Sequence, residues 1–146
     1  MQLILIVEDE YGAAEILQLV LGAEGYEVLV ASNGKEAMEI IESGKVPDLI
    51  ISDFMMPVMN GGEFGRFVDR NEQLDKTPFV FMSGTSEDVV RQVYENYDDF
   101  LVKPFDIDAL LNTVSRLINV DVTMRKASRS AESSVQGLLK KIKLPE

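Results

Sequence analysis

Short apolar runs alternate with longer amphipathic segments five times along the chain. The apolar runs have the length of β-strands, and the first of them, residues 2–7 (QLILIV), is almost uninterrupted. Uninterrupted apolar strands are typical of parallel sheets that are covered on both faces. The pattern predicts strands at residues 2–7, 26–31, 48–52, 79–83 and 100–102.

Each predicted strand is followed by a segment with helical spacing of its apolar positions. The helix that begins after residue 8 carries Ala13, Ile16, Leu17, Val20 and Leu21 and stops near Gly25. The other helices are predicted at residues 35–43, 62–71, 87–96 and 106–120. Five strand–helix repeats predict an α/β fold, a doubly wound five-stranded parallel sheet with helices on both faces and right-handed crossovers.

Residues 121–146 differ from the rest of the chain. They carry six basic and three acidic residues, whereas the first 120 residues carry eight basic and 22 acidic residues. After a Ser-rich stretch, Val135, Leu138, Leu139 and Ile142 follow the i, i+3, i+4, i+7 pattern of an amphipathic helix. We expect one domain at residues 1–120, then a polar linker and a short basic helix. Docking of this helix on the acidic body and binding to a partner or to a second copy are both open.

Composition excludes several kinds of chemistry. The 146 residues contain no Cys and no His, which removes disulfides, thiolate nucleophiles and imidazole-based catalysis. The net charge of −11 argues against direct contact with nucleic acid. No apolar stretch approaches the roughly 20 residues that span a bilayer. We therefore expect a cytoplasmic protein that acts through carboxylates, hydroxyls, lysines or a bound ion.

Polar side chains follow four of the five predicted strands. The ends of parallel strands meet at one edge of the sheet, where ligands of such folds bind. The residues in question are Glu8, Asp9 and Glu10 after the first strand, Asp53 after the third, Ser83 at the end of the fourth and Lys103 after the fifth. Taken singly, each is more simply explained as a helix cap, a turn residue or a solvated lysine. Caps and turns do not explain why all of them fall on one edge.

The charges of this group imply a cation. Two carboxylates about 4 Å apart repel by roughly 4 kcal/mol at an effective dielectric near 20. Oxygen ligands of this kind suit Mg²⁺. A metal, a lysine and a hydroxyl around a carboxylate predict phosphoryl transfer with the carboxylate as nucleophile. Because neither a Walker loop nor a Gly-x-Gly-x-x-Gly turn is present, we expect the phosphoryl donor to bind elsewhere or to be another protein.

These motifs resemble the receiver domain of two-component response regulators over roughly residues 2–120. The matching stretches are Glu8-Asp9, DFMMPVMNG from Asp53, Ser83-Gly84 and Lys103-Pro104. The acid pair is Glu-Asp where Asp-Asp is commoner. The resemblance implies the flavodoxin-like strand order 2-1-3-4-5.

The resemblance also implies a role for each residue of the motifs. Asp53 is then the phosphoacceptor, and Mg²⁺ is held by Asp9, Asp53, the backbone carbonyl of Met55 and Glu8. Ser83 and Phe100 are the switch residues, and Lys103 is the cationic partner of the phosphoryl group. Phe100 lacks the hydroxyl of the tyrosine that is frequent at its position.

The implied partners are a sensor histidine kinase or a phosphotransfer protein, which supply the missing histidine. A downstream protein would bind the face made by the fourth helix, fifth strand and fifth helix, without contact to nucleic acid or membrane. Formation of a homodimer stays open.

We expect a stand-alone signalling switch that catalyses only its own phosphorylation and dephosphorylation. The first alternative is a receiver cut from a larger regulator, hybrid kinase or enzyme. A second is a Mg²⁺-dependent phosphatase with an aspartyl nucleophile, although such enzymes typically carry an aspartate where Met55 stands. A third is a binding module that is never phosphorylated.

Overall fold

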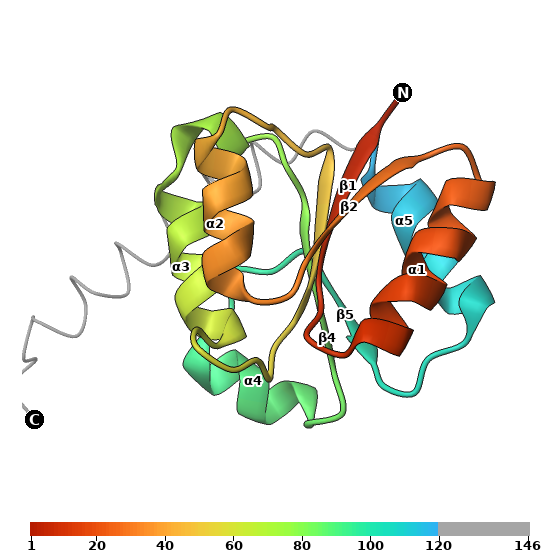
Figure 1. Ribbon diagram of the computed structural model, residues 1–146. Coiled ribbons are helices and arrows are strands. Elements are labelled where there is room, and N and C mark those ends of the chain that lie inside the picture. The colour runs from red at the N-terminus through yellow and green to blue at the C-terminus, as the bar shows by residue number, and fades with distance from the viewer. Residues whose placement is uncertain (120–146) are drawn as a thin grey trace, which may run out of the picture.

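A computed structural model of the chain describes residues 1–119 (Figure 1). They form one five-stranded parallel sheet in the order β2-β1-β3-β4-β5. Its strands are β1 (Leu3–Val7), β2 (Glu27–Ala31), β3 (Leu49–Asp53), β4 (Phe79–Ser83) and β5 (Asp99–Val102). The predicted fold class and strand order are confirmed, and the strand ends fall within two residues of their predicted positions.

The helices cover both faces of the sheet. Figure 1 shows α1 and α5 on one face and α2, α3 and α4 on the other. The helices are α1 (Tyr11–Ala23), α2 (Gly34–Glu42), α3 (Gly61–Arg70), α4 (Glu87–Val93) and α5 (Ile107–Leu117), with a short 3₁₀ turn η1 (Glu72–Leu74) after α3. Asn33, Asn60 and Asp106 cap α2, α3 and α5 by accepting a backbone N–H three residues ahead.

Alternation along the strands separates the apolar side chains into two cores. Odd positions of β1, such as Leu5 and Val7, face α2, α3 and α4 together with Phe79 and Phe81 of β4. Even positions, such as Ile4 and Ile6, face α1 and α5. Because both faces are filled, the central strands are apolar throughout, as the sequence indicated.

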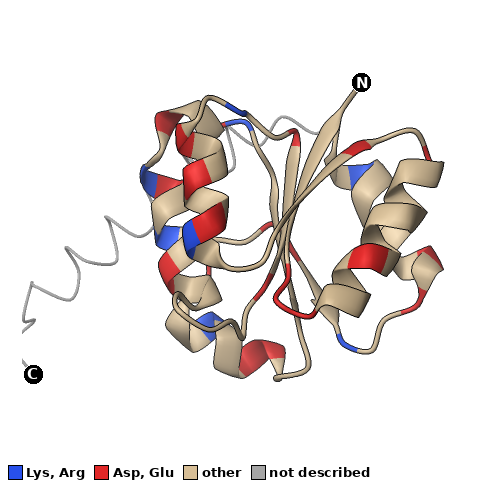
Figure 2. Ribbon diagram, in the orientation of Figure 1, with Lys and Arg blue, Asp and Glu red and all other residues tan. Residues whose placement is uncertain are grey.

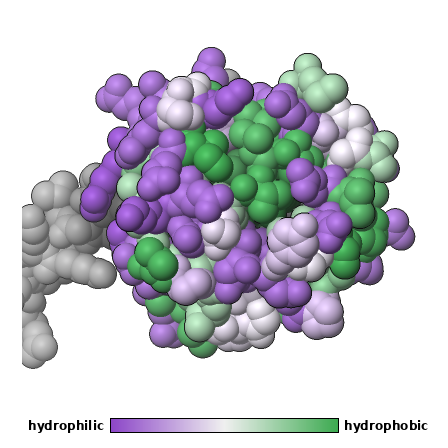
Figure 3. Space-filling model, in the orientation of Figure 1, coloured by the Kyte–Doolittle hydropathy of each residue, from purple (hydrophilic) through white to green (hydrophobic). Residues whose placement is uncertain are grey.

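The exposed face of α1 differs from expectation. Ala14, Leu17 and Leu21 are buried, as helical spacing requires, but Ile16 is 57% exposed and Leu19 is 67% exposed. With few charges to mark its outer face, the helix did not reveal from sequence which apolar residues it buries. Figure 3 shows apolar residues on this helix and over the edge strand β2 beside it.

Two further predictions require correction. α4 ends at Val93, not at Asn96, and of its valines only Val90 is buried. Tyr94 follows in extended conformation and turns its ring into the core, which ends the helix early. α5 begins at Ile107, with Asp106 as its cap, and ends at Leu117, short of the predicted residue 120.

The predicted linker and basic helix at residues 121–146 lie outside the described residues. Within residues 1–119, no helix is long and apolar enough to cross a membrane.

Strand register brings the predicted site residues together. Val7 pairs with Ser52, so Glu8 lies beside Asp53. Asp53 pairs with Met82, and Met82 pairs with Leu101. Ser83 is therefore one residue, and Lys103 two residues, beyond the level of Asp53. All of them gather at the carboxyl ends of the neighbouring strands β1, β3, β4 and β5.

Candidate functional site

The centre of the site is an ion-pair cluster of Lys103 with two carboxylates. Lys103 Nζ donates to Asp53 Oδ2 at 3.0 Å and to Glu8 Oε1 and Oε2 at 3.2 and 3.1 Å. Glu8 is 2% exposed and Asp53 is 7% exposed, whereas about a third of the lysine side chain reaches solvent. Lys103 is thus not a solvated lysine but the shared partner of both acids.

Burial and neighbouring charge shift the protonation of this cluster. Burial, followed by the hydrogen bond and charge of Asp53, raises the pKa of Glu8 from 4.5 to about 7, although Lys103 acts in the opposite direction. Burial by itself lowers the pKa of Lys103, but its hydrogen bonds to Asp53 and Glu8 outweigh that effect and raise it. Lys103 therefore stays charged, whereas the carboxyl group of Glu8 loses its proton less readily than an exposed glutamate.

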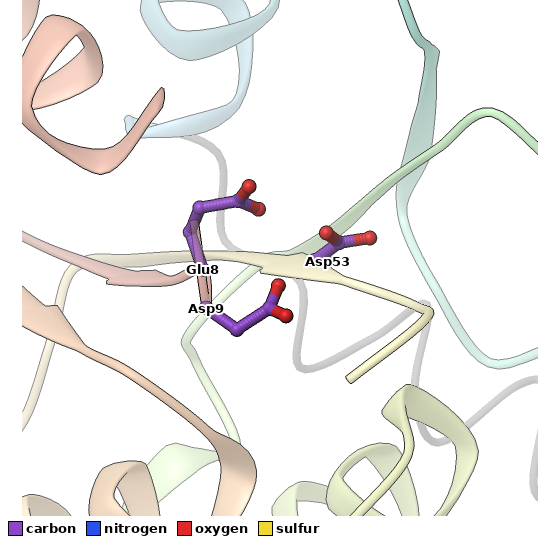
Figure 4. A group of neighbouring side chains, drawn as sticks. All are labelled: Glu8, Asp9 and Asp53. Carbon is purple, nitrogen blue, oxygen red and sulfur yellow. The ribbon is translucent and has the colours of Figure 1, made fainter. Parts of the chain in front are cut away.

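Asp9 completes a group of three carboxylates. Oxygen atoms of Glu8, Asp9 and Asp53 lie within 4.8 Å of one another, with Asp9 exposed at the surface. Figure 4 shows Glu8 and Asp9 extending toward Asp53, and Figure 2 shows the acidic loop after β1 at this edge of the sheet. With all groups ionised, three carboxylates and one ammonium leave a formal charge of −2. An all-oxygen donor set with this charge fits a divalent ion such as Mg²⁺.

The β3–α3 loop passes close to Asp53. Asp53 Oδ1 accepts the backbone N–H of Met55 at 3.3 Å, which is the contact expected of a turn residue. Asp53 therefore acts as a turn residue and also pairs with Lys103. Val58 has φ of 71° and lies at the centre of a turn in which Met59 N–H bonds Pro57 C=O at 2.7 Å. A β-branched residue is strained in this conformation.

Gly61 lets α3 start against the end of β3. A Cβ atom there would lie 2.7 Å from Phe54 Cα and 2.8 Å from the Phe81 ring. The Gly61 N–H bonds Phe54 C=O at 2.8 Å, which pins the helix to the residue after Asp53. Only glycine fits this approach, because neither the backbone nor the enclosed ring can move aside cheaply.

Ser83 and Phe100, the two predicted switch residues, lie on the neighbouring strands β4 and β5. Ser83 is fully buried at the end of β4, and its Oγ accepts the backbone N–H of Thr85 at 3.0 Å, not a bond that caps α4. That bond uses a lone pair of the hydroxyl and not its proton. Phe100 is half-buried in β5, with its ring centroid 5.9 Å from that of Tyr97.

Sequence reasoning missed Tyr97. Its ring lies 5.6 Å from Phe81 and 5.9 Å from Phe100, and its hydroxyl contacts Glu87 and Arg91 of α4. The position of a tyrosine three residues before the predicted switch residue Phe100 could have marked it as a candidate. What it contacts depends on α4, whose length the sequence did not predict.

The fold and the charged cluster at the carboxyl edge of the sheet are those of receiver domains. The profile of the response regulator receiver domain matches residues 4–115. The chain belongs to this family.

Relatives and solved structures agree with that assignment. The chain is 33% identical over 145 residues to the probable transcriptional regulator ycf29 of Pyropia yezoensis, covering 97% of this chain and 64% of that protein. It is 37% identical over 117 residues to response regulator ArlR of Staphylococcus saprophyticus, covering 79% and 51%. The chain thus spans about half to two thirds of these curated relatives.

Among solved structures, chemotaxis protein CheY4 of Vibrio cholerae superposes with a TM-score of 0.75 at 33% identity, covering 80% of this chain and 98% of that chain. Response regulator TrrA of Thermotoga maritima, in complex with Mg²⁺ and BeF, gives a TM-score of 0.72 at 32% identity, covering 80% and 99%. Both have the receiver fold described above.

Proposed function

We propose that this receiver is a phospho-aspartate switch in which Asp53 accepts the phosphoryl group. The observation that carries the proposal is the Asp53 carboxylate, held at the sheet edge by Lys103 beside Glu8 and Asp9. An Asp53 oxygen attacks phosphorus as the bond from phosphorus to the donor breaks, and a mixed carboxylic–phosphoric anhydride forms. A phosphohistidine donor leaves as imidazole with a proton from solvent, and an acyl phosphate leaves as a carboxylate.

The neighbouring groups neutralise charge during this transfer. Lys103 already contacts Asp53 and stands ready for a phosphoryl oxygen. Asp9, Glu8, Asp53 and the Met55 carbonyl would hold Mg²⁺, which when bound supplies positive charge to the phosphoryl oxygens. The N–H of Met55, rather than its carbonyl, is the group seen in contact with Asp53, so the carbonyl ligand stays a prediction.

We further propose that Ser83 and Phe100 transmit phosphorylation to the face made by α4, β5 and α5. The phosphoryl group adds up to two negative charges and accepts charge-assisted hydrogen bonds of about 1.5 to 3 kcal/mol each. Shifting an equilibrium from 1:99 to 99:1 takes about 5.5 kcal/mol, which two or three such bonds supply. Ser83 would turn its hydroxyl proton toward the phosphoryl oxygens, and Phe100 would fill the space that it leaves.

A histidine kinase or phosphotransfer protein is the proposed donor, and a protein that binds the α4–β5–α5 face is the proposed target. Relatives named as transcriptional regulators, such as ycf29 and PhoB of Rhizobium meliloti, favour the alternative in which this receiver works within a longer regulator. The length of the complete gene separates these two arrangements. In either, residues 1–120 are the proposed receiver and residues 121–146 a linker with a basic helix.

Incubation with acetyl phosphate and Mg²⁺, followed by intact mass measurement, tests the proposal. The wild-type chain should gain one phosphoryl group, and Asp53→Asn should gain none. Asp69→Asn serves as the matched control, since this carboxylate lies on α3 and bonds Asn96 away from the site. Full labelling of Asp53→Asn would refute the assignment. Sustained hydrolysis of a small phosphate ester would instead favour the phosphatase.

A further inference from the structure

Tyr97 connects α4 with the strands β4 and β5. Its hydroxyl donates to Glu87 Oε1 at 2.9 Å and accepts from Arg91 Nε at 3.5 Å, both on α4. Its ring packs between Phe81 of β4 and Phe100 of β5. Arg91 also pairs with Glu87 at 3.7 Å. One half-buried side chain therefore ties the first turn of α4 to the sheet.

The hydrogen bond between Tyr97 and Glu87 lies close in sequence to Ser83. β4 ends at Ser83 and α4 begins at Glu87, so only three residues separate them. Ser83 Oγ accepts the N–H of Thr85 within this loop. A rotation of the Ser83 hydroxyl toward a phosphoryl group on Asp53 would disturb that bond. The displacement would then reach Glu87, which carries the carboxylate that Tyr97 holds.

We propose that Tyr97 is a positioning residue whose bond to Glu87 holds α4 in its unphosphorylated place. The inference rests on the proposed function, since it assigns a further residue to the same switch. Phe100 has a ring but no hydroxyl, so it responds to phosphorylation only through packing. The Tyr97 hydroxyl supplies a polar contact that Phe100 lacks, and its acceptor, the Glu87 carboxylate, is charged. Phosphorylation must weaken this bond for α4 to move.

Substitution Tyr97→Phe tests the bond, because it keeps the ring and removes only the hydroxyl. If the bond favours the unphosphorylated state, the variant should bind beryllofluoride with Mg²⁺ about tenfold more tightly than wild type. Titration calorimetry measures that affinity. In the wild-type protein labelled with ¹³C-tyrosine, the Tyr97 ring resonance should shift when beryllofluoride is added.

Tyr94→Phe is the matched control. The Tyr94 ring lies in the same aromatic cluster, 5.7 Å from Phe81, but its hydroxyl donates to the Asn96 carbonyl at 3.2 Å. Its affinity for beryllofluoride should equal that of wild type. Glu87→Gln keeps an acceptor but removes its charge, so it should act in the same direction as Tyr97→Phe with a smaller effect.

Each outcome decides the inference. Unchanged or weaker beryllofluoride affinity in Tyr97→Phe would overturn it, as would an equal gain in Tyr94→Phe. A loosened fold cannot imitate the expected result, because damage to the site lowers affinity. Failure of wild-type protein to bind beryllofluoride would count against the proposed function itself, whereas normal wild-type binding with an indifferent Tyr97→Phe would count against Tyr97 alone.

Discussion

At the scale of a single residue, Glu8 is an acidic side chain that is buried within a charged site. Its carboxylate contacts Lys103, and the carboxylates of Asp9 and Asp53 face it from the same edge of the sheet. The sequence marked Glu8 as an acid longer than the commoner aspartate. It did not reveal that the side chain is buried deeply enough to raise its pKa to about 7.

This pKa predicts how stability depends on pH when metal is removed. In chelator, the folded state keeps a proton on Glu8 up to about pH 7, whereas the unfolded chain releases it near 4.5. The folded state therefore binds more protons between these two values, and the free energy of unfolding should fall as pH rises from about 4.5 to about 7. The contribution is at most about 1.4 kcal/mol per pH unit.

Urea unfolding of wild type and Glu8→Gln across this range measures the effect. Glutamine cannot titrate, so the variant should lose less stability over the same pH range. Carboxylates away from the site are the same in both proteins, so their contributions cancel in the comparison. Parallel pH profiles would show that the burial of Glu8 does not control its protonation.

At the scale of an element, the β3–α3 loop begins directly after Asp53, the last residue of β3. The loop contains Pro57 and leads into Gly61 and Gly62, and the structure shows why a glycine stands at position 61. The start of α3 at Gly61 lies against the backbone of Phe54 and the ring of Phe81. The strained turn at Val58 lies in the loop between Asp53, at the end of β3, and Gly61, at the start of α3.

Gly61→Ala should lower the free energy of unfolding by about 1 to 3 kcal/mol, because the added methyl group meets a backbone atom and an enclosed ring. Gly22→Ala is its control within a helix. No atom lies within 4 Å of a Cβ at Gly22, so this change should stabilise the protein by about 0.5 to 1 kcal/mol. Thermal unfolding compares the two variants. Equal stability of Gly61→Ala and wild type would mean that the loop moves aside.

At the scale of the whole molecule, the described residues form two apolar cores, one on either side of the sheet. Among the described residues, the last buried side chains are Leu117 at the end of α5 and Ile118 directly after it, and the receiver profile ends at residue 115. We therefore expect the described residues to supply most of the stability of the receiver.

A chain truncated after residue 120 should fold with a Tm within about 5 °C of the full chain, a shift that corresponds to roughly 1 to 2 kcal/mol. Truncation after residue 113 removes Val114, Leu117 and Ile118, whose burial is worth about 2 kcal/mol or more each, and should prevent folding. Calorimetry checks both. A large loss of Tm in the longer fragment would show that residues 121–146 stabilise the body.

The sequence by itself determined the class of fold, the order of its elements and the edge at which the charged residues meet. These follow from local physics, since strand and helix periodicity is written in neighbouring residues and parallel strands share one carboxyl edge. Asp53, Glu8, Asp9, Ser83 and Lys103 were all identified in this way. Their roles as phosphoacceptor, metal ligands and switch stay predictions.

Only the tertiary structure decided which of these groups touch and how deeply they are buried. Lys103 contacts Glu8 and Asp53, which are distant from it in sequence. The exposure of Ile16, the early end of α4 and the contacts of Tyr97 depend on how the elements pack. Such contacts depend on strand register and helix packing, which no local pattern encodes. The physical reason is that burial and pairing are properties of the assembled neighbourhood, not of the residue.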